Sequence, residues 1–265
     1  MRPTSKPTHL GPQYADQFKD LSVASAYLHR PPYPAEVFDL LECLIKGRPR
    51  VVLDMGCGTG DIAIPMADRV DRVDAVDPSE AMLRMARTRP GWDRENIRWV
   101  CTSAEEFDYR ERYGLITAGA SLHWMDWYVV LGEMRRSLLE SAFLAIASGR
   151  QEENSPWRDR SMEIIPRYST NRDFQPYDLI EELESRSLFR VVGRQRSAPA
   201  RLRMPIRDYV EMIHSQNGFS RERMTAESAA AFDSESTAAI TPFASGNEVS
   251  LELTSTVTLG RPLEG

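Results

Sequence analysis

The stretch VVLDMGCGTG, residues 51–60, decides the fold class of this chain. An apolar, β-branched run leads into three glycines at alternate positions, Gly56, Gly58 and Gly60. Glycine lets the backbone turn tightly there and lets a ligand approach without a clash against a Cβ atom. Residues 61–70 return to helical periodicity, so the first amide N–H groups of that helix would point at the ligand. We therefore expect a strand, a ligand-binding loop and a helix in succession.

Two carboxylates accompany the glycine loop. Asp54 lies two residues before the first glycine, and Asp77 ends the next expected strand, at the ~20-residue interval of an acid that takes ribose hydroxyls. The spacing is GxGxG and not the GxGxxG of dinucleotide folds. A ligand with a cationic amino-acid end favours an acid beside the loop, and Asp54 supplies one. The alternative is a plain tight turn, which the coincidence of loop and acids disfavours.

Strand-like and helix-like segments alternate through the first 149 residues. Strands are expected at 50–55, 73–76, 97–101, 115–118 and 142–147, and helices at 34–46, 61–70, 79–89 and 127–139. This alternation predicts an α/β fold with a parallel, doubly wound sheet. Further along, 187–196 resembles a strand, 205–236 is mostly helical, and 249–259 alternates apolar and polar residues as one antiparallel or edge strand does.

Composition excludes several classes of protein. The net charge of −6, from 33 basic and 39 acidic residues, argues against a nucleic-acid partner. Three cysteines without metal-binding spacing and four scattered histidines predict neither a disulfide framework nor a metal site. The polar N-terminal residues 1–14 do not resemble a signal peptide, and the longest apolar run, 142–147, is too short to cross a bilayer. We expect a cytoplasmic protein with no membrane partner.

Residues 51–147 resemble a class I S-adenosylmethionine-dependent methyltransferase of the type 11 domain kind, close to trans-aconitate-methyltransferase-like enzymes of small molecules. Five motifs carry the resemblance: VLDMGCGTG (52–60), AVDPS (75–79), TSAEEF (102–107), LITAGASLHWMDW (115–127) and, upstream, YLHRPPYP (27–34). The chain departs from the family pattern at Ser103 and Gly114, where relatives often have an acid, and at 139–141, where they have Pro-Gly-Gly.

The resemblance implies a Rossmann-like sheet, mostly parallel with a final antiparallel strand, plus helical cap insertions. It divides the chain into an N-terminal arm (1–34, of which 1–20 is expected to be loose), an S-adenosylmethionine-binding core (35–149), cap insertions with one core strand at about 187–197 (150–248), and a final strand and tail (249–265).

The resemblance also implies roles for single residues. Asp54, Gly56 and Gly58 would surround the methionine end of the cofactor, Ala118 would line that side, Arg30 would meet the cofactor carboxylate, and Asp77 would bind both ribose hydroxyls. The adenine would be bound by the backbone N–H of Ala104, with Ser103 or Glu105 near its exocyclic amine.

The pair His123-Trp124 follows the fourth expected strand, at the edge where open α/β sheets bind ligands. His123 is either a general base for a hydroxyl or amine acceptor or a structural histidine that shapes the loop. Trp124 is either a stacking surface for the substrate or sulfonium, or part of the core. Asp126 is expected to cap the helix that follows. Tyr14, a candidate substrate contact, forms with Phe18 and Tyr27 an arm that closes over the cofactor, or these aromatics simply pack.

Six arginines are concentrated in the second half of the chain, at positions 190, 194, 196, 201, 203 and 207. They form either a site for a carboxylate or phosphate, or a solvated strand face balanced by acids at 178–184.

The sequence therefore predicts transfer of a methyl group from S-adenosylmethionine to an oxygen or nitrogen atom of a small-molecule metabolite, by a biosynthetic enzyme that is a monomer or homodimer. Three alternatives stay open: an enzyme that binds the same cofactor but catalyses an isomerase-like or pericyclic step, a non-catalytic partner subunit, and an NAD enzyme.

Overall fold

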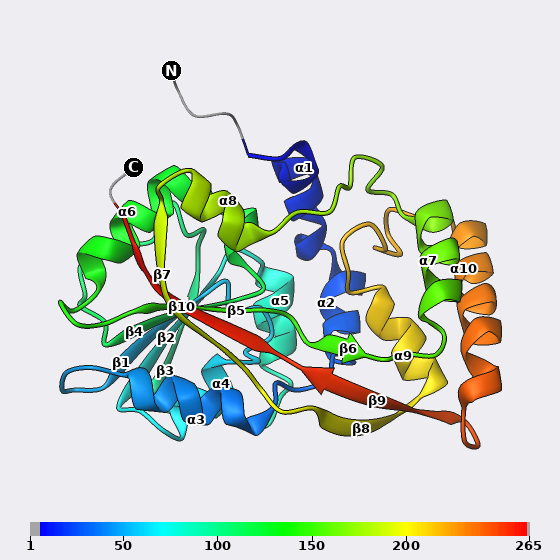
Figure 1. Ribbon diagram of the computed structural model, residues 1–265, viewed down its shortest axis with the longest axis horizontal. Coiled ribbons are helices and arrows are strands. Elements are labelled where there is room, and N and C mark those ends of the chain that lie inside the picture. The colour runs from blue at the N-terminus through cyan, green and yellow to red at the C-terminus, as the bar shows by residue number, and fades with distance from the viewer. Residues whose placement is uncertain (1–5, 264–265) are drawn as a thin grey trace.

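The computed structural model describes residues 6–263 and consists of an α/β core and a smaller cap (Figure 1). The core is a seven-stranded sheet. Its strands, in order across the sheet, are β3 (Ile97–Cys101), β2 (Arg72–Asp77), β1 (Val51–Met55), β4 (Leu115–Gly119), β5 (Leu144–Ala147), β10 (Thr256–Pro262) and β7 (Phe189–Arg196). The five strands β1 to β5 pair in parallel, whereas β10 is antiparallel to both of its neighbours. The expected fold class is confirmed.

Helices cover both faces of this sheet, which explains why its central strands read as continuous apolar runs. The helices α3 (Ala35–Leu44) and α4 (Ala63–Ala67) pack with Val52 and Leu115 on one face. The helices α6 (Trp127–Ser137) and α8 (Leu179–Ser185) pack on the other face with Leu53. The helix α5 (Glu80–Ala86) follows β2 and contacts both β2 and β3.

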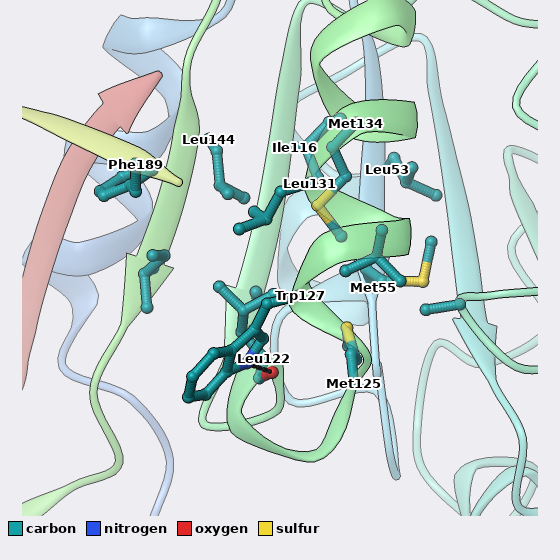
Figure 2. Packing of buried hydrophobic residues seen from close by; sticks show 14 of the residues in the cluster. Leu53, Met55, Ile116, Leu122, Met125, Trp127, Leu131, Met134, Leu144 and Phe189 are labelled. Carbon is teal, nitrogen blue, oxygen red and sulfur yellow. Dashed lines mark hydrogen bonds between the residues drawn. The ribbon is translucent and has the colours of Figure 1, made fainter. Parts of the chain in front are cut away.

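The start of α6 is fixed by a cap and by an anchored indole. Asp126 accepts a hydrogen bond from the backbone N–H of Tyr128, as expected for the N-cap residue. The Trp127 indole donates to the carbonyl oxygen of Leu122 at 2.9 Å, within the short 3₁₀ turn η3 (Leu122–Trp124). Figure 2 shows this bond, with Leu131 and Met134 of α6 turned toward the sheet. The loop after β4 is thereby held firmly beside the carboxyl edge of the sheet.

The single strand expected at 249–259 is wrong, because the structure divides it in two. The strand β9 (Glu248–Thr254) pairs with β6 (Gln151–Glu153) and β8 (Ala200–Pro205) in a separate three-stranded sheet of the cap, and β10 begins at Thr256. Figure 1 shows both strands along one extended ribbon. The backbone stays extended as it changes partner sheet, so the period-two pattern continues through the change and does not reveal it.

The cap otherwise consists of α7 (Arg158–Tyr168), α9 (Ile206–Ile213), α10 (Ala226–Ile240) and the turn η4 (Thr241–Phe243), around a core of their own side chains. Helical insertions were expected, but the strands β6 and β8 were not. The residues of β8 alternate arginine with apolar residues, and β6 lies in a polar stretch. Both strands are stable only as partners of β9.

The arm is not loose over the residues that the structure describes. It forms η1 (Thr8–Leu10), α1 (Pro12–Ala15), η2 (Asp16–Lys19) and α2 (Leu21–Tyr27). It lies between core and cap, where α2 contacts α5 on one side and α9 on the other. Residues 1–5 of the expected arm and 264–265 of the expected tail lie outside the described residues. Within 6–263, no helix has the length and apolar character needed to span a membrane.

Candidate functional site

A cavity of about 240 Å³ lies at the carboxyl ends of β1, β2 and β4, between the glycine loop and the arm. Most of the residues singled out in the sequence line it: Arg30, Asp54, Gly56, Gly58, Asp77, Ser103, Ala104, Glu105 and Trp124. These residues come from distant segments of the chain and are brought together because the carboxyl ends of parallel strands share one edge of the sheet.

The glycine loop is held against β2 by its backbone. The N–H groups of Gly56 and Cys57 both donate to the carbonyl oxygen of Val76, at 2.8 and 2.9 Å. Gly56 has φ +73°, and a Cβ atom there would lie 2.4 Å from the Cβ of Ser121. Gly58 has φ +54°. Both positions therefore need glycine, the first for space as well as for backbone conformation.

Asp77 joins the loop to the start of α5. Its carboxylate accepts hydrogen bonds from the N–H groups of Gly58, at 2.8 Å, and of Ser79, at 2.9 Å. Burial raises the pKa of this carboxyl to about 6, against the two hydrogen bonds that favour its charged form. The carboxylate is thus fixed beside the glycine loop, with further lone pairs for hydroxyl donors.

Asp54 is the more deeply buried of the two loop carboxylates. Its Oδ1 accepts a hydrogen bond from the Thr117 hydroxyl at 2.8 Å. Its Oδ2 is buried and accepts no hydrogen bond of ordinary geometry from the described residues, although the backbone N–H of Ala63 favours the charged form of this carboxyl. Burial raises the pKa of this carboxyl to about 7. A buried carboxylate oxygen without a donor is costly, and a cationic group of a ligand would satisfy it.

Aromatic side chains form the wall of the cavity on the arm side. The Phe18 ring lies 5.2 Å from Trp124 and 6.2 Å from Tyr27, measured between ring centroids. The guanidinium of Arg30 lies over the Tyr27 ring at 3.8 Å. Phe18, Tyr27 and Trp124 thus all line the cavity.

Several residues of the cavity wall were not singled out as site residues, among them Tyr33, Asp61 and Arg150. The guanidinium of Arg150 donates to Asp61 Oδ2 and to the carbonyl oxygen of Pro31, both at 2.6 Å. Asp61 directly follows the last loop glycine, and Arg150 follows the expected strand 142–147 by three residues. Arg150 lies just beyond a parallel strand, where sheets of this kind bind ligands, and this position would have identified it as a candidate site residue.

Three predicted site residues do not line this cavity. Ala118 is fully buried inside β4, and its neighbours Gly119 and Ala120 line the cavity in its place. The Tyr14 hydroxyl donates to Asp173 at 2.7 Å, which ties the arm to the loop before α8. His123 packs against Trp124 and Tyr177.

The environment of His123 bears on its chemistry. Burial, and then the charges of Lys6 and Arg30, lower the pKa of its ring to about 3. The imidazole is therefore neutral at physiological pH but a weak proton acceptor.

The arginine-rich segment lies outside the cavity wall. Arg201 and Arg203 form ion pairs with Glu252 and Glu248 of β9, at 3.1 and 3.0 Å. The acids that balance these two arginines thus come from β9 and not from 178–184. Such exposed cross-strand pairs contribute little to stability.

A second cavity, of about 610 Å³, lies at the junction of core and cap. It shares Arg30 and Arg150 with the first cavity and is otherwise lined by Pro31, Gly149, Glu152, Arg158, Tyr209, Met212, Gln216, Leu251 and Leu253. Among the residues that the structure describes, no group of three or more His, Cys, Asp or Glu side chains is placed to hold a metal ion.

Comparisons with known proteins agree with this geometry. Residues 52–141 match a family model described as a methyltransferase domain. The malonyl-[acyl-carrier protein] O-methyltransferase of Acetivibrio thermocellus is 29% identical over 115 residues, which cover 42% of this chain and 40% of that protein. The match thus spans less than half the length of that curated relative.

Solved structures share the fold over nearly the whole chain. A putative type II methyltransferase from Anaeromyxobacter dehalogenans superimposes with a TM-score of 0.60 and 24% identity, covering 87% of this chain and 96% of that one. The [4+2]-cyclase SpnF gives a TM-score of 0.56 at 16% identity, with 98% of each chain covered. Residues 52–141, which hold the glycine loop and strands β1 to β4, thus match a methyltransferase domain, and the solved structures show that the chain shares its fold with proteins described as methyltransferases.

Proposed function

We propose that this protein binds S-adenosylmethionine in the first cavity and transfers its methyl group to an oxygen or nitrogen atom of a small-molecule metabolite held beneath the cap. The observation that carries the proposal is the buried, unpartnered Oδ2 of Asp54 in a cavity that the glycine loop forms. The family match and the O-methyltransferase relative support the same activity.

The residues in the cavity fit the cofactor. The ammonium group of its methionine end would satisfy Asp54, and the ribose hydroxyls would donate to Asp77 beside Gly58. Ala104, Ser103 and Glu105 line the remaining side, where the adenine would lie. Arg30 is near enough to the cavity to meet the cofactor carboxylate, although its Nε and Nη2 donate to Ser215 here.

When bound, S-adenosylmethionine supplies a methyl group on a sulfonium, which leaves as a neutral thioether. The chain then needs to position the acceptor in line and exclude water. Phe18, Tyr27 and Trp124 provide an aromatic, dry wall, and an indole face attracts a cation such as a sulfonium.

The role of His123 as a general base stays a prediction. Its lowered pKa favours the alternative, in which the neutral ring supports Trp124 and the loop after β4. A base is needed only when the acceptor atom arrives protonated at the working pH. An acceptor that arrives ionised, or as a free amine, requires none.

The cyclase among the structural neighbours shows that the fold alone does not imply methyl transfer. The alternative of a non-methyl-transfer step on the same cofactor is therefore retained. Small-molecule specificity, the cytoplasmic location and the monomer or homodimer expected from the sequence also stay predictions.

Isothermal titration with S-adenosylhomocysteine, and separately with NADH, tests the cofactor assignment. We expect saturable binding of the nucleoside thioether with one site per chain, and clearly weaker binding in the Asp77→Ala variant. Binding of NADH alone would reject the proposal. Formation of S-adenosylhomocysteine during turnover of an acceptor then separates methyl transfer from a non-transfer step, since the latter converts its substrate without consuming the cofactor.

A further inference from the structure

The second cavity differs from the first in the sign of its charged residues. The first cavity is lined by five carboxylates and three cationic side chains: Asp16, Asp54, Asp61, Asp77 and Glu105 against Lys19, Arg30 and Arg150. The second is lined by three arginines and one carboxylate: Arg30, Arg150 and Arg158 against Glu152. The two neighbouring cavities therefore suit ligand groups of opposite charge.

The arginines of the second cavity are not fully neutralised by their neighbours. Arg150 pairs with Asp61, but Asp61 also pairs with Arg89, so this trio carries a net positive charge. Arg30 donates to the uncharged hydroxyl and carbonyl oxygens of Ser215. Arg158 forms no ion pair with any residue that the structure describes. Burial raises the pKa of the Glu152 carboxyl, against the nearby charge of Arg158, which favours its ionised form.

The rest of the second cavity is apolar on the cap side. Leu251 and Leu253 of β9 point from the small sheet, and Met212 lies on α9. The polar groups of Tyr209 and Gln216 complete the wall. The Tyr209 hydroxyl is already engaged, because it donates to Glu152 at 2.7 Å. A ligand with an apolar body and a single acidic group matches this lining.

We propose that the second cavity is the acceptor site and holds a carboxylate of the acceptor against Arg158 and Arg150, with the apolar body of the acceptor on Met212, Leu251 and Leu253. This assignment rests on the proposed methyltransferase function. Arginine binds carboxylates through paired N–H donors. A carboxylate fits better than a phosphate dianion because Glu152 shares the cavity and repels a second negative charge.

The position of the arginines links the two sites. Arg30 and Arg150 line both cavities, so an acid held by Arg150 lies beside the cofactor cavity. The Arg150 side chain is only 6% exposed and is fixed by Asp61 and Pro31. It therefore presents its guanidinium without reorganising, whereas the exposed Arg158 on α7 is free to close over the ligand.

Octanoate serves as the probe for this site, because it combines one carboxylate with an apolar chain. Its binding is measured by isothermal titration on protein saturated with S-adenosylhomocysteine, beside octanol, octylamine and octyl phosphate. Arg158→Gln removes one of the three cationic side chains that line the second cavity, at an exposed position. Arg160→Gln, two residues further along α7 and also exposed but outside the cavity wall, is the control for removal of an arginine from this helix.

We expect octanoate to bind more tightly than the other three probes. Arg158→Gln should weaken it by roughly tenfold or more, as for loss of a charge-assisted hydrogen bond, and Arg160→Gln should leave it unchanged. Absent octanoate binding, equal loss in both variants, or tighter binding of octanol, octylamine or octyl phosphate overturns the acceptor-site assignment. Failure of the proposed function is distinguished by the first titration, because S-adenosylhomocysteine itself would then not bind.

Discussion

The hydroxyl of Thr117 on β4 donates to Oδ1 of Asp54 on β1 at 2.8 Å and satisfies that oxygen alone. Oδ2 of the same carboxyl is buried without a partner among the described residues. One oxygen of this buried carboxyl is thus held by the protein, and the other is left to accept a hydrogen bond from a ligand. The free energy that this arrangement costs the unliganded protein becomes available to binding when a cation arrives.

The Asp54 carboxyl should make cofactor binding depend on pH. Its pKa is raised to about 7 in the unliganded protein, and a bound ammonium group favours the ionised form. Affinity for S-adenosylhomocysteine should therefore rise from pH 5 to pH 7.5, with protons released on binding. Titrations at pH 6.5 in buffers of different ionisation enthalpy measure that release. Asp54→Asn should abolish most of it, and an unchanged proton release in the variant would contradict the assignment.

The same carboxyl should make the unliganded protein less stable as pH rises. Its folded pKa, about 7, lies above the ordinary value of 3.8, so the folded state binds the proton more tightly than the unfolded state. The stabilisation is fully present below 3.8 and is lost as pH rises through about 7. Urea unfolding at several pH values should show this slope. In Asp54→Asn it should flatten, whereas an equally steep slope would assign it to other groups.

Substitution of Asp77 should weaken the cofactor complex. Asp77→Ala is expected to reduce the binding free energy by about 2–3 kcal/mol, because two charge-assisted hydrogen bonds to the ribose are lost. The measurement is the dissociation constant of S-adenosylhomocysteine. Glu80→Gln, at an exposed residue three positions later, is the control and should bind normally. An unchanged constant for Asp77→Ala would refute the ribose contact.

The loop glycines should differ in their tolerance of a methyl group. Gly58→Ala places a Cβ 3.9 Å from the Tyr27 ring, an ordinary van der Waals contact, so only the backbone strain at φ +54° is felt, about 1–2 kcal/mol of unfolding free energy. Gly56→Ala adds a clash with Ser121 and should cost about 2–5 kcal/mol. Urea unfolding checks both. Gly193→Ala, where a Cβ meets nothing within 4 Å, is the control. A reversed order would show that the loop relaxes freely.

Because His123 is neutral, we expect the pH dependence of turnover to show no step that comes from protonation of this residue. The pKa of the His123 ring is lowered to about 3. The pH profile of turnover in the wild type should therefore show no acidic limb near pH 6.5 that disappears in the His123→Phe variant. The variant should keep kcat within about tenfold, since general-base catalysis contributes ~10²-fold or more where it operates. The readout is kcat from pH 5 to 9 with any acceptor whose turnover forms S-adenosylhomocysteine. A loss of 10²-fold or more with a vanished limb would restore His123 as the base.

The contacts of Arg30 predict that two substitutions act separately, one on the stability of the protein and the other on its affinity for the cofactor. Ser215→Ala removes the hydroxyl that accepts from Arg30 Nε at 2.7 Å and should lower stability by about 1 kcal/mol. It should leave the affinity for S-adenosylhomocysteine within about threefold, because Arg30 keeps its charge beside the cavity. Arg30→Lys should weaken that affinity by about tenfold, since a lysine cannot form paired hydrogen bonds with a carboxylate. Equal affinity in wild type and Arg30→Lys would remove Arg30 from the cofactor site.

Much of the fold and of the candidate cofactor site follows from local patterns in the sequence. The apolar runs that become β1 to β5 are interrupted by helical periods, which leaves a doubly wound sheet as the consistent arrangement. The loop glycines and the acids Asp54 and Asp77 lie at strand ends, and parallel strands bring their ends together without further information. The N-cap that the Asp126 side chain provides for α6 likewise depends only on neighbouring residues.

Tertiary structure alone decided the rest. Arg150 meets Asp61 across 89 residues and Pro31 across 119, and no periodicity or spacing encodes such a meeting. The change of sheet between β9 and β10 is likewise invisible, because both strands are extended and only their partners differ. The sequence by itself determined which segments form strands, helices and the glycine loop, since those choices depend on neighbouring residues. That Arg158 of the cap faces a cavity depended on how the cap closes over the core, a packing of distant surfaces that short-range patterns do not specify.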